Sequence, residues 1–208
     1  MVIWLVGMSG VGKTTIADIL FKKISNDTDA SAIPIDGDIV RLIDRNDKKE
    51  TSYSLEARHK NAKRIQEISL ALDKSGENVI CSILCIFPDI LEENKKIFSS
   101  YYEVFLDASL EELERRDTKG LYASARRGEI SDLVGYDIEF PIPKEPNLHL
   151  KTDQKESARE LANIIYDETH HNMNMGNKDM DLKSHLSEAR NAIDYAEIIS
   201  KIIKPVGG

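Results

Sequence analysis

Glycines, a lysine and two threonines near the start of the chain have a spacing suited to phosphate binding. The segment Gly7-Met-Ser-Gly-Val-Gly-Lys-Thr14 matches the Walker A pattern Gly-x-x-x-x-Gly-Lys-Thr. Glycines let backbone N–H groups converge on phosphate oxygens, and Lys13 adds a positive charge for the β- and γ-phosphates. The hydroxyl of Thr14 can bind Mg²⁺. We predict that a nucleoside triphosphate binds to Gly7, Ser9, Gly10, Gly12, Lys13, Thr14 and Thr15.

Two carboxylates, Asp36 and Asp38, follow the second predicted strand and suit a kinase. There they can hold Mg²⁺ through water and accept a proton from an acceptor hydroxyl. A GTPase would need an Asn-Lys-x-Asp motif, but Asn177-Lys178-Asp179 has the wrong spacing. A motor-type ATPase would usually place an acid after its central strand, whereas the run ending at Pro88 has none.

The apolar pattern predicts strands that alternate with helices around these motifs. This alternation indicates a doubly wound α/β domain with a parallel sheet of the P-loop type. The run 79–87 is apolar on both faces and is the best candidate for the central strand. Residues 115–147 are rich in charge, Gly and Pro and are expected to be mobile or irregular. The predicted strands cover 2–6, 32–35, 79–87, 102–106 and 148–150; the predicted helices cover 15–24, 54–75, 89–98, a segment opened by Ser109, and 154–167.

The end of the chain is predicted to lie outside the nucleotide-binding domain. We expect a domain over 1–168, a linker over 169–181 and an amphipathic helix over 182–204. The pair His170-His171 falls in the linker and is not expected to bind metal. The helix needs a surface to cover its apolar stripe. It either packs back on its own domain, or forms a homodimer or docks on a neighbouring enzyme.

Composition and charge narrow the class of protein. The 208 residues include 28 Lys and Arg against 36 Asp and Glu, a formal net charge of −8. This balance argues against a general nucleic-acid or membrane-surface binder. We expect no membrane span and no signal peptide. Cys81 and Cys85 are too far apart on a strand for a disulfide, so we expect buried, reduced cysteines in a cytoplasmic protein.

Four segments together resemble the adenylylsulfate kinase family. In family order they are 7–15, Asp-Gly-Asp-Ile-Val-Arg at 36–41, 54–64, and 116–126 followed by Gly-Glu at 128–129. The resemblance covers about residues 1–167, and the element Lys119-Gly-Leu-Tyr-x-x-Ala-Arg126 is unusual outside this family. Such kinases transfer the γ-phosphoryl group of ATP to the 3′-hydroxyl of adenosine 5′-phosphosulfate. The resemblance therefore implies ATP and Mg²⁺ as cofactors and a small nucleotide as acceptor.

The resemblance also implies roles for particular residues. Asp38 would be the base at the acceptor hydroxyl, with Lys13 as its catalytic partner at the phosphates, and Asp36 would organise Mg²⁺ with Thr14. Tyr53 would stack on the acceptor base. Arg41, Arg58 and Asn61 would bind the acceptor's phosphate and terminal group. A lid that closes over both nucleotides would be formed by Arg116 on the ATP side and by Lys119, Leu121 and Arg126 on the acceptor side.

Simpler interpretations stay open for several of these side chains. Asp36 and Asp38 could be turn or helix-capping acids. Arg41 and Arg58 could be solvated helix charges. Lys119 and Arg126 could be ordinary loop charges, and Tyr53 a plain surface aromatic.

Three departures from the family pattern all fall on the acceptor side. The family's Ile-Ser-Pro-Tyr-Arg segment is here Leu84-Cys-Ile-Phe-Pro88. Leu133 stands where the family has a second aromatic that stacks on the acceptor base. Ala57 stands where the family usually has an acid before its conserved arginine. A second hypothesis is therefore a kinase for cytidine diphosphoramidate in bacterial capsule modification. A third is a non-catalytic nucleotide-binding module.

Overall fold

The computed structural model describes residues 1–26, 30, 32–41, 54–117 and 119–174 of the 208-residue chain. Its described strands form one sheet of five, all parallel, in the order β2-β3-β1-β4-β5. The strands are β1 (Val2–Val6), β2 (Ala32–Asp36), β3 (Asn78–Ile83), β4 (Tyr101–Asp107) and β5 (Leu148–Lys151). The helices are α1 (Lys13–Asn26), α3 (Leu55–Lys74), α4 (Pro88–Ile97), α5 (Leu110–Arg116), α6 (Leu121–Arg126) and α7 (Ala158–Thr169). The predicted α/β class is confirmed.

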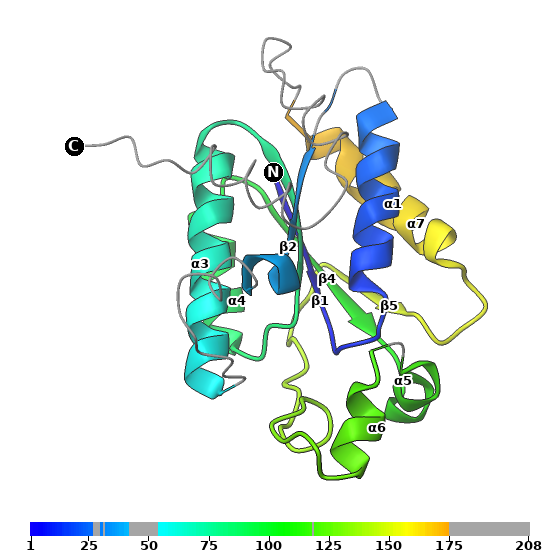
Figure 1. The fold of residues 1–208 in the computed structure, drawn as a ribbon. Helices are drawn as coiled ribbons and strands as arrows, with labels where there is room; N and C mark the ends of the chain where they lie inside the picture. The colour runs from blue at the N-terminus through cyan, green and yellow to red at the C-terminus, as the bar shows by residue number, and fades with distance from the viewer. Residues whose placement is uncertain (27–29, 31, 42–53, 118, 175–208) are drawn as a thin grey trace.

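Helices cover both faces of this sheet, as a parallel sheet requires. Helices α1 and α7 lie on one side, and α3 and α4 lie on the other (Figure 1). The alternation of β1 divides its side chains between two cores: Ile3 and Leu5 pack with α1 and α7, and Trp4 packs with α3 and α4. The two short helices α5 and α6 lie beyond the carboxyl ends of the strands (Figure 1).

The central strand is β1 rather than the predicted run 79–87. Strand β1 pairs with β3 on one side and β4 on the other, and all five of its residues are buried. Strand β3 is the next strand out and ends at Ile83. The chain then turns toward α4, because Pro88 sets the first turn of that helix and cannot donate a ladder hydrogen bond. The run 2–6 and the run 79–87 are both apolar on both faces, so only the strand pairing shows which of them is central in the sheet.

Side-chain caps set several helix boundaries. Ser54 caps α3 as predicted, since its hydroxyl accepts from the Ala57 N–H at 3.3 Å. Ser109 caps α5 in the same way. Helix α7 begins later than predicted, at Ala158, because Ser157 and Glu160 form a reciprocal capping box.

Two segments differ from their sequence-based descriptions. The irregular stretch 115–147 contains α6, which starts after Gly120 in the left-handed conformation. The expected start of the linker lies against the domain: Thr169 is buried, and the Asn174 N–H donates to Asn78 Oδ1 at 2.9 Å. The predicted helix over 182–204 lies outside the described residues, so its role in dimerisation or docking stays a prediction.

Cys81 and Cys85 are buried free thiols, as predicted. Burial raises the pKa of both thiols, that of Cys85 to about 12. Neither is therefore a reactive thiolate. Among the helices of the described residues, none combines the length and apolar character that a membrane crossing requires.

One buried carboxyl group lies between β4 and the α3–α4 layer. Glu103 is 1% exposed, and it accepts a hydrogen bond from the Tyr101 hydroxyl at 2.8 Å. Asn94 donates to that hydroxyl and accepts from Gln66, which extends the network to α3. Burial raises the pKa of Glu103, although the hydrogen bond from Tyr101 and the charge of Lys95 counteract it.

We predict that Glu103→Gln raises the melting temperature at neutral pH but not near pH 4.5, the ordinary pKa of glutamate. A carboxyl group whose folded pKa is raised favours folding below its unfolded pKa, and this contribution is lost as pH rises through the folded pKa. Glutamine accepts the same hydrogen bond without charge. Thermal unfolding at both pH values tests this, and an equal shift at both would contradict it.

Candidate active site

A cavity of about 810 Å³ opens at the carboxyl ends of the strands. Its wall combines the loop after β1, the start of α1, the residues after β2, the end of β3, α6 and the segment after β5. In open α/β sheets the crevice outside these strand ends is the usual place for ligands. The sheet order places this crevice where β1 is flanked by β3 and β4.

The loop after β1 is shaped by two glycines with different constraints. Gly7 packs so closely on β4 that a Cβ there would lie 2.3 Å from the Leu106 carbonyl oxygen. Gly12 has φ +96°, a backbone conformation that residues with a side chain rarely adopt. Lys13 Nζ donates to the carbonyl oxygens of Gly7 and Met8, both at 2.8 Å. The lysine is thereby curled over its own loop at the start of α1.

The pKa of the Lys13 ammonium group is strongly shifted by its surroundings in the cavity wall. Burial lowers the pKa of Lys13 to about 8, although the charges of Asp38 and Asp36 oppose this shift. Phosphate oxygens at the same place would stabilise the charged form.

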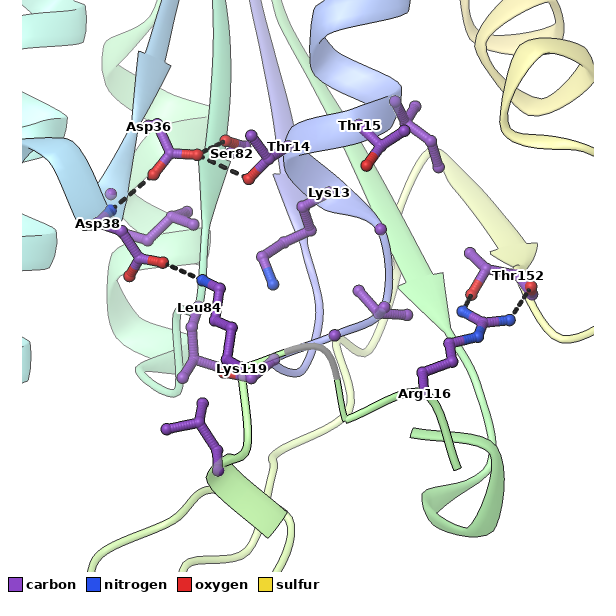
Figure 2. Close-up of a pocket in the computed structure, with 18 of the residues that line it drawn as sticks. Lys13, Thr14, Thr15, Asp36, Asp38, Ser82, Leu84, Arg116, Lys119 and Thr152 are labelled. Atoms are coloured by element: carbon purple, nitrogen blue, oxygen red, sulfur yellow. Dashed lines mark hydrogen bonds and ion pairs between the residues drawn. The ribbon is translucent and has the colours of Figure 1, made fainter. Parts of the chain in front are cut away.

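Asp36 is the junction between the phosphate loop and the second strand. Its Oδ2 accepts from the Thr14 hydroxyl at 2.7 Å and from the Ser82 hydroxyl at 3.1 Å. Its Oδ1 accepts from the Asp38 N–H at 2.8 Å, where residues 37–41 begin a helix. Figure 2 shows these three contacts converging on one carboxylate. Asp36 is thus a helix-capping acid and also a neighbour of the loop threonine.

Asp38 and Lys119 join the second strand to the segment before α6. Lys119 Nζ donates to Asp38 Oδ2 at 2.6 Å, across 81 positions of sequence. Burial acts to raise the pKa of Asp38, but the hydrogen bond and charge of Lys119, with the charges of Arg41 and Lys13, lower it overall. Asp38 is therefore an ionised carboxylate at neutral pH, which a proton acceptor must be.

Arg116 lies at the other end of the cavity, with Lys13 between it and Asp38 (Figure 2). Its guanidinium donates to the Thr152 carbonyl at 2.6 Å and to the Thr152 hydroxyl at 3.2 Å. Its Nε donates to Glu112 at 2.8 Å. The planar guanidinium is thereby fixed at the edge of the cavity, with Ala158 and Leu161 also in the wall.

Arg58 and Asn61 come from the same part of α3 and face the cavity near Asp38. Arg58 is 7% exposed and donates to the Asp132 carbonyl at 2.8 Å, so the interpretation as a solvated charge is wrong. Asn61 Nδ2 donates to the Gly37 carbonyl at 3.3 Å. Within the described residues, Asn61 Oδ1 is buried without a hydrogen-bond donor. A buried acceptor of this kind suits a ligand N–H or O–H.

Most of the predicted site residues line this one cavity; of those that the structure describes, Gly7 and Arg126 do not. Gly7 is buried behind the wall. Arg126 forms an ion pair with Glu114 on α5 and is not part of the wall, so its role at the acceptor stays a prediction. Tyr53 lies outside the described residues. The predicted residues in the wall are Ser9, Gly10, Gly12, Lys13, Thr14, Thr15, Asp36, Asp38, Arg41, Arg58, Asn61, Arg116, Lys119, Leu121 and Leu133.

Sequence reasoning missed several residues of the wall. Ser82 lies inside the apolar run of β3, and its contact with Asp36 depends on the register of β2 and β3. Asp132 contributes a carbonyl, which carries no side-chain signal. Thr152 follows a short strand whose place beside β4 is a property of the sheet. Ile130 looks like an ordinary apolar residue in sequence.

Comparisons with known proteins agree with one family. A family model described as adenylylsulphate kinase matches residues 1–151. The adenylyl-sulfate kinase of Picosynechococcus sp. is 36% identical over 163 residues, covering 78% of this chain and 90% of that protein. The adenylyl-sulfate kinase of Saccharomyces cerevisiae is 37% identical over 169 residues, covering 79% and 81%. The Mycobacterium tuberculosis APS kinase in complex with AMPPNP and APS has a TM-score of 0.71 at 30% identity, covering 80% and 95%.

We predict that nucleotide binding takes up protons above about pH 8, because phosphate oxygens restore the charged form of Lys13. Calorimetric titration with ADP in buffers of different ionisation enthalpy measures this uptake. The control is Lys13→Arg, whose guanidinium stays charged and should abolish the uptake. An equal uptake by both proteins would contradict the assignment.

Proposed function

Because this chain belongs to the adenylylsulphate kinase family, we propose that it transfers the γ-phosphoryl group of ATP to the 3′-hydroxyl of adenosine 5′-phosphosulfate. One observation carries this proposal. Asp36 joins Thr14 of the phosphate loop to the main chain of Asp38, and Asp38 in turn contacts Lys119. The phosphate loop, the expected proton acceptor Asp38 and the expected lid cation Lys119 all line one cavity, which supports the proposal.

The donor nucleotide is expected at the end of the cavity formed by the phosphate loop and Arg116. Residues 9–16 line this end and would surround the triphosphate. The nucleoside would lie toward Arg116 and Thr152, where a fixed guanidinium offers a flat surface for a base. ATP is the donor used by the family that the sequence resembles, and a relative of known structure was solved with its analogue AMPPNP.

The acceptor nucleotide is expected at the other end, near Asp38, Arg58 and Asn61. The carboxylate of Asp38 would take the proton of the 3′-hydroxyl. The oxygen then forms a bond to the γ-phosphorus while the bond from that phosphorus to the ADP oxygen breaks. The products are ADP and the 3′-phosphorylated acceptor. Arg41 and Arg58 would bind the acceptor's anionic groups, since a guanidinium makes paired bonds to oxyanions.

The residues around Asp36 fit a magnesium ion. Mg²⁺ in kinases is usually held by one or two protein oxygens together with the phosphates. The Thr14 hydroxyl and the Asp36 carboxylate are two such groups, 2.7 Å apart. When bound, the ion would neutralise charge on the β- and γ-phosphates. Thr14 would hold it directly, and Asp36 would orient the threonine or a water ligand.

Lys119 belongs to the segment that would close as a lid over the acceptor end of the cavity. Its ammonium group contacts Asp38 from a segment that also contributes Leu121 to the wall. With both nucleotides bound, an acceptor hydroxyl would compete with Lys119 for the same carboxylate. Closing this segment over the cavity would exclude water that could otherwise hydrolyse ATP.

Cytidine diphosphoramidate is the second candidate acceptor, because the described part of the cavity wall has Leu133 where the family resemblance implies an aromatic. Leu133 is 6% exposed and is held by the Asp137 carboxylate through its N–H at 3.0 Å. Leu84, Leu121 and Ile130 add further aliphatic surface. Such a wall contacts a base without the stacking that an aromatic provides. The known relatives named above favour the adenosine compound.

We predict fast ADP formation with adenosine 5′-phosphosulfate and ATP, and little with cytidine diphosphoramidate. Steady-state rates for both acceptors, with product identified by mass, make the comparison. Turnover of the cytidine compound alone would overturn the proposal in favour of the second candidate. Turnover of neither would favour a non-catalytic nucleotide-binding module.

We predict that Asp38→Asn lowers kcat by about 10²–10⁴-fold while ADP affinity is retained, since the amide cannot accept the hydroxyl proton. Lys119→Met serves as the matched variant. It removes the cation that lowers the pKa of Asp38, so the acidic limb of kcat/KM should move to higher pH. Wild-type kcat in Asp38→Asn, or an acidic limb unmoved in Lys119→Met, would contradict these roles.

A further inference from the structure

We propose that Ser82 is a positioning residue for phosphoryl transfer, which acts by holding the carboxylate of Asp36. The inference rests on the proposed function and adds a residue to it. Ser82 is near the end of β3, is 5% exposed and lines the cavity. Its hydroxyl donates to Asp36 Oδ2 at 3.1 Å (Figure 2).

The sheet fixes the geometry of this contact. Strands β2 and β3 are parallel neighbours, and Asp36 is the register partner of Ser82. Residues paired in register project their side chains to the same face of the sheet. The pairing of β2 with β3 therefore fixes the position of the Ser82 hydroxyl beside the Asp36 carboxylate.

Ser82 differs from the other two donors on this carboxylate. The Thr14 hydroxyl is the expected ligand of the magnesium ion, and the Asp38 N–H belongs to the expected base. Both of these donors take part in the events of the reaction. Ser82 is bound to neither nucleotide in the proposed arrangement, so its hydrogen bond can hold Asp36 through substrate binding and release.

Without the Ser82 hydroxyl, the Asp36 carboxylate would be less firmly oriented toward both Thr14 and Asp38. Oδ2 faces Thr14, and Oδ1 anchors the main chain of Asp38. A rotated carboxylate would weaken metal binding and displace the proton acceptor at once. Because small displacements of reacting groups lower rates strongly, the effect should appear in kcat more than in KM for ATP.

Ser69 offers a matched control on the helix that packs against β3. It is fully buried on α3, and its hydroxyl lies 3.6 Å from the Cys81 sulfur, outside the cavity wall. Ser69→Ala therefore removes a buried hydroxyl of similar burial without touching Asp36.

The experiment compares Ser82→Ala, Ser82→Thr and Ser69→Ala in the full chain. Binding of Mn²⁺ to the ADP complex, followed by electron paramagnetic resonance, reports on the metal site without any acceptor. We expect Ser82→Ala to weaken Mn²⁺ binding and lower kcat, each by about tenfold, as for loss of a hydrogen bond to a charged group. Ser82→Thr should recover both, and Ser69→Ala should match the wild type. Thermal melts confirm that each variant is folded.

Wild-type Mn²⁺ affinity and kcat in Ser82→Ala would overturn the proposal. Equal losses in Ser69→Ala would overturn it too, because the effect would then be a general one of core packing. A folded Ser82→Thr variant that recovers neither Mn²⁺ affinity nor kcat would also overturn the proposal. If the wild type phosphorylates no acceptor, the proposed function fails, whereas the Mn²⁺ measurement still decides the role of Ser82.

Discussion

The carboxylate of Asp36 is the contact on which the arrangement of the cavity depends. It accepts from Thr14 at the start of α1, from Ser82 on β3 and from the main chain of Asp38. Three segments that are distant in sequence are thereby joined at the carboxyl ends of neighbouring strands. A charged acceptor with three donors is a strong local constraint, since hydrogen bonds to ionised groups are stronger than neutral ones. The place of the proposed base follows from it.

Internal partners also hold the cations of the cavity. Lys13 donates to two loop carbonyls, Lys119 to Asp38, Arg116 to Thr152 and Glu112, and Arg58 to Asp132. These contacts allow a chain of net charge −8 to gather positive groups around one cleft. Anionic ligands would replace some of these partners, and the side chains are already near the positions where phosphates are expected.

Much of the fold was predictable because its signals are local. The apolar runs of β1 and β3, the caps Ser54 and Ser109, and the glycine loop each depend on neighbours within a few residues. Other features of the fold depend on interactions between segments. The order of β1 and β3 depends on pairing, which two equally apolar runs cannot reveal. The later start of α7 has a local cause, because Ser157 and Glu160 form a capping box within four residues of sequence.

The sequence by itself determined the chemistry of the site: a phosphate loop, two acids after a strand, and cations in a segment near α6. These follow from residue type and short spacing, which sequence records directly. Only the tertiary structure decided that Ser82 holds Asp36, that Lys119 reaches Asp38 across 81 positions, and that Arg58 binds a carbonyl rather than solvent. The physical reason is that strand register, the packing of α3 against the sheet and the folding of the segment before α6 over the cavity bring these groups together.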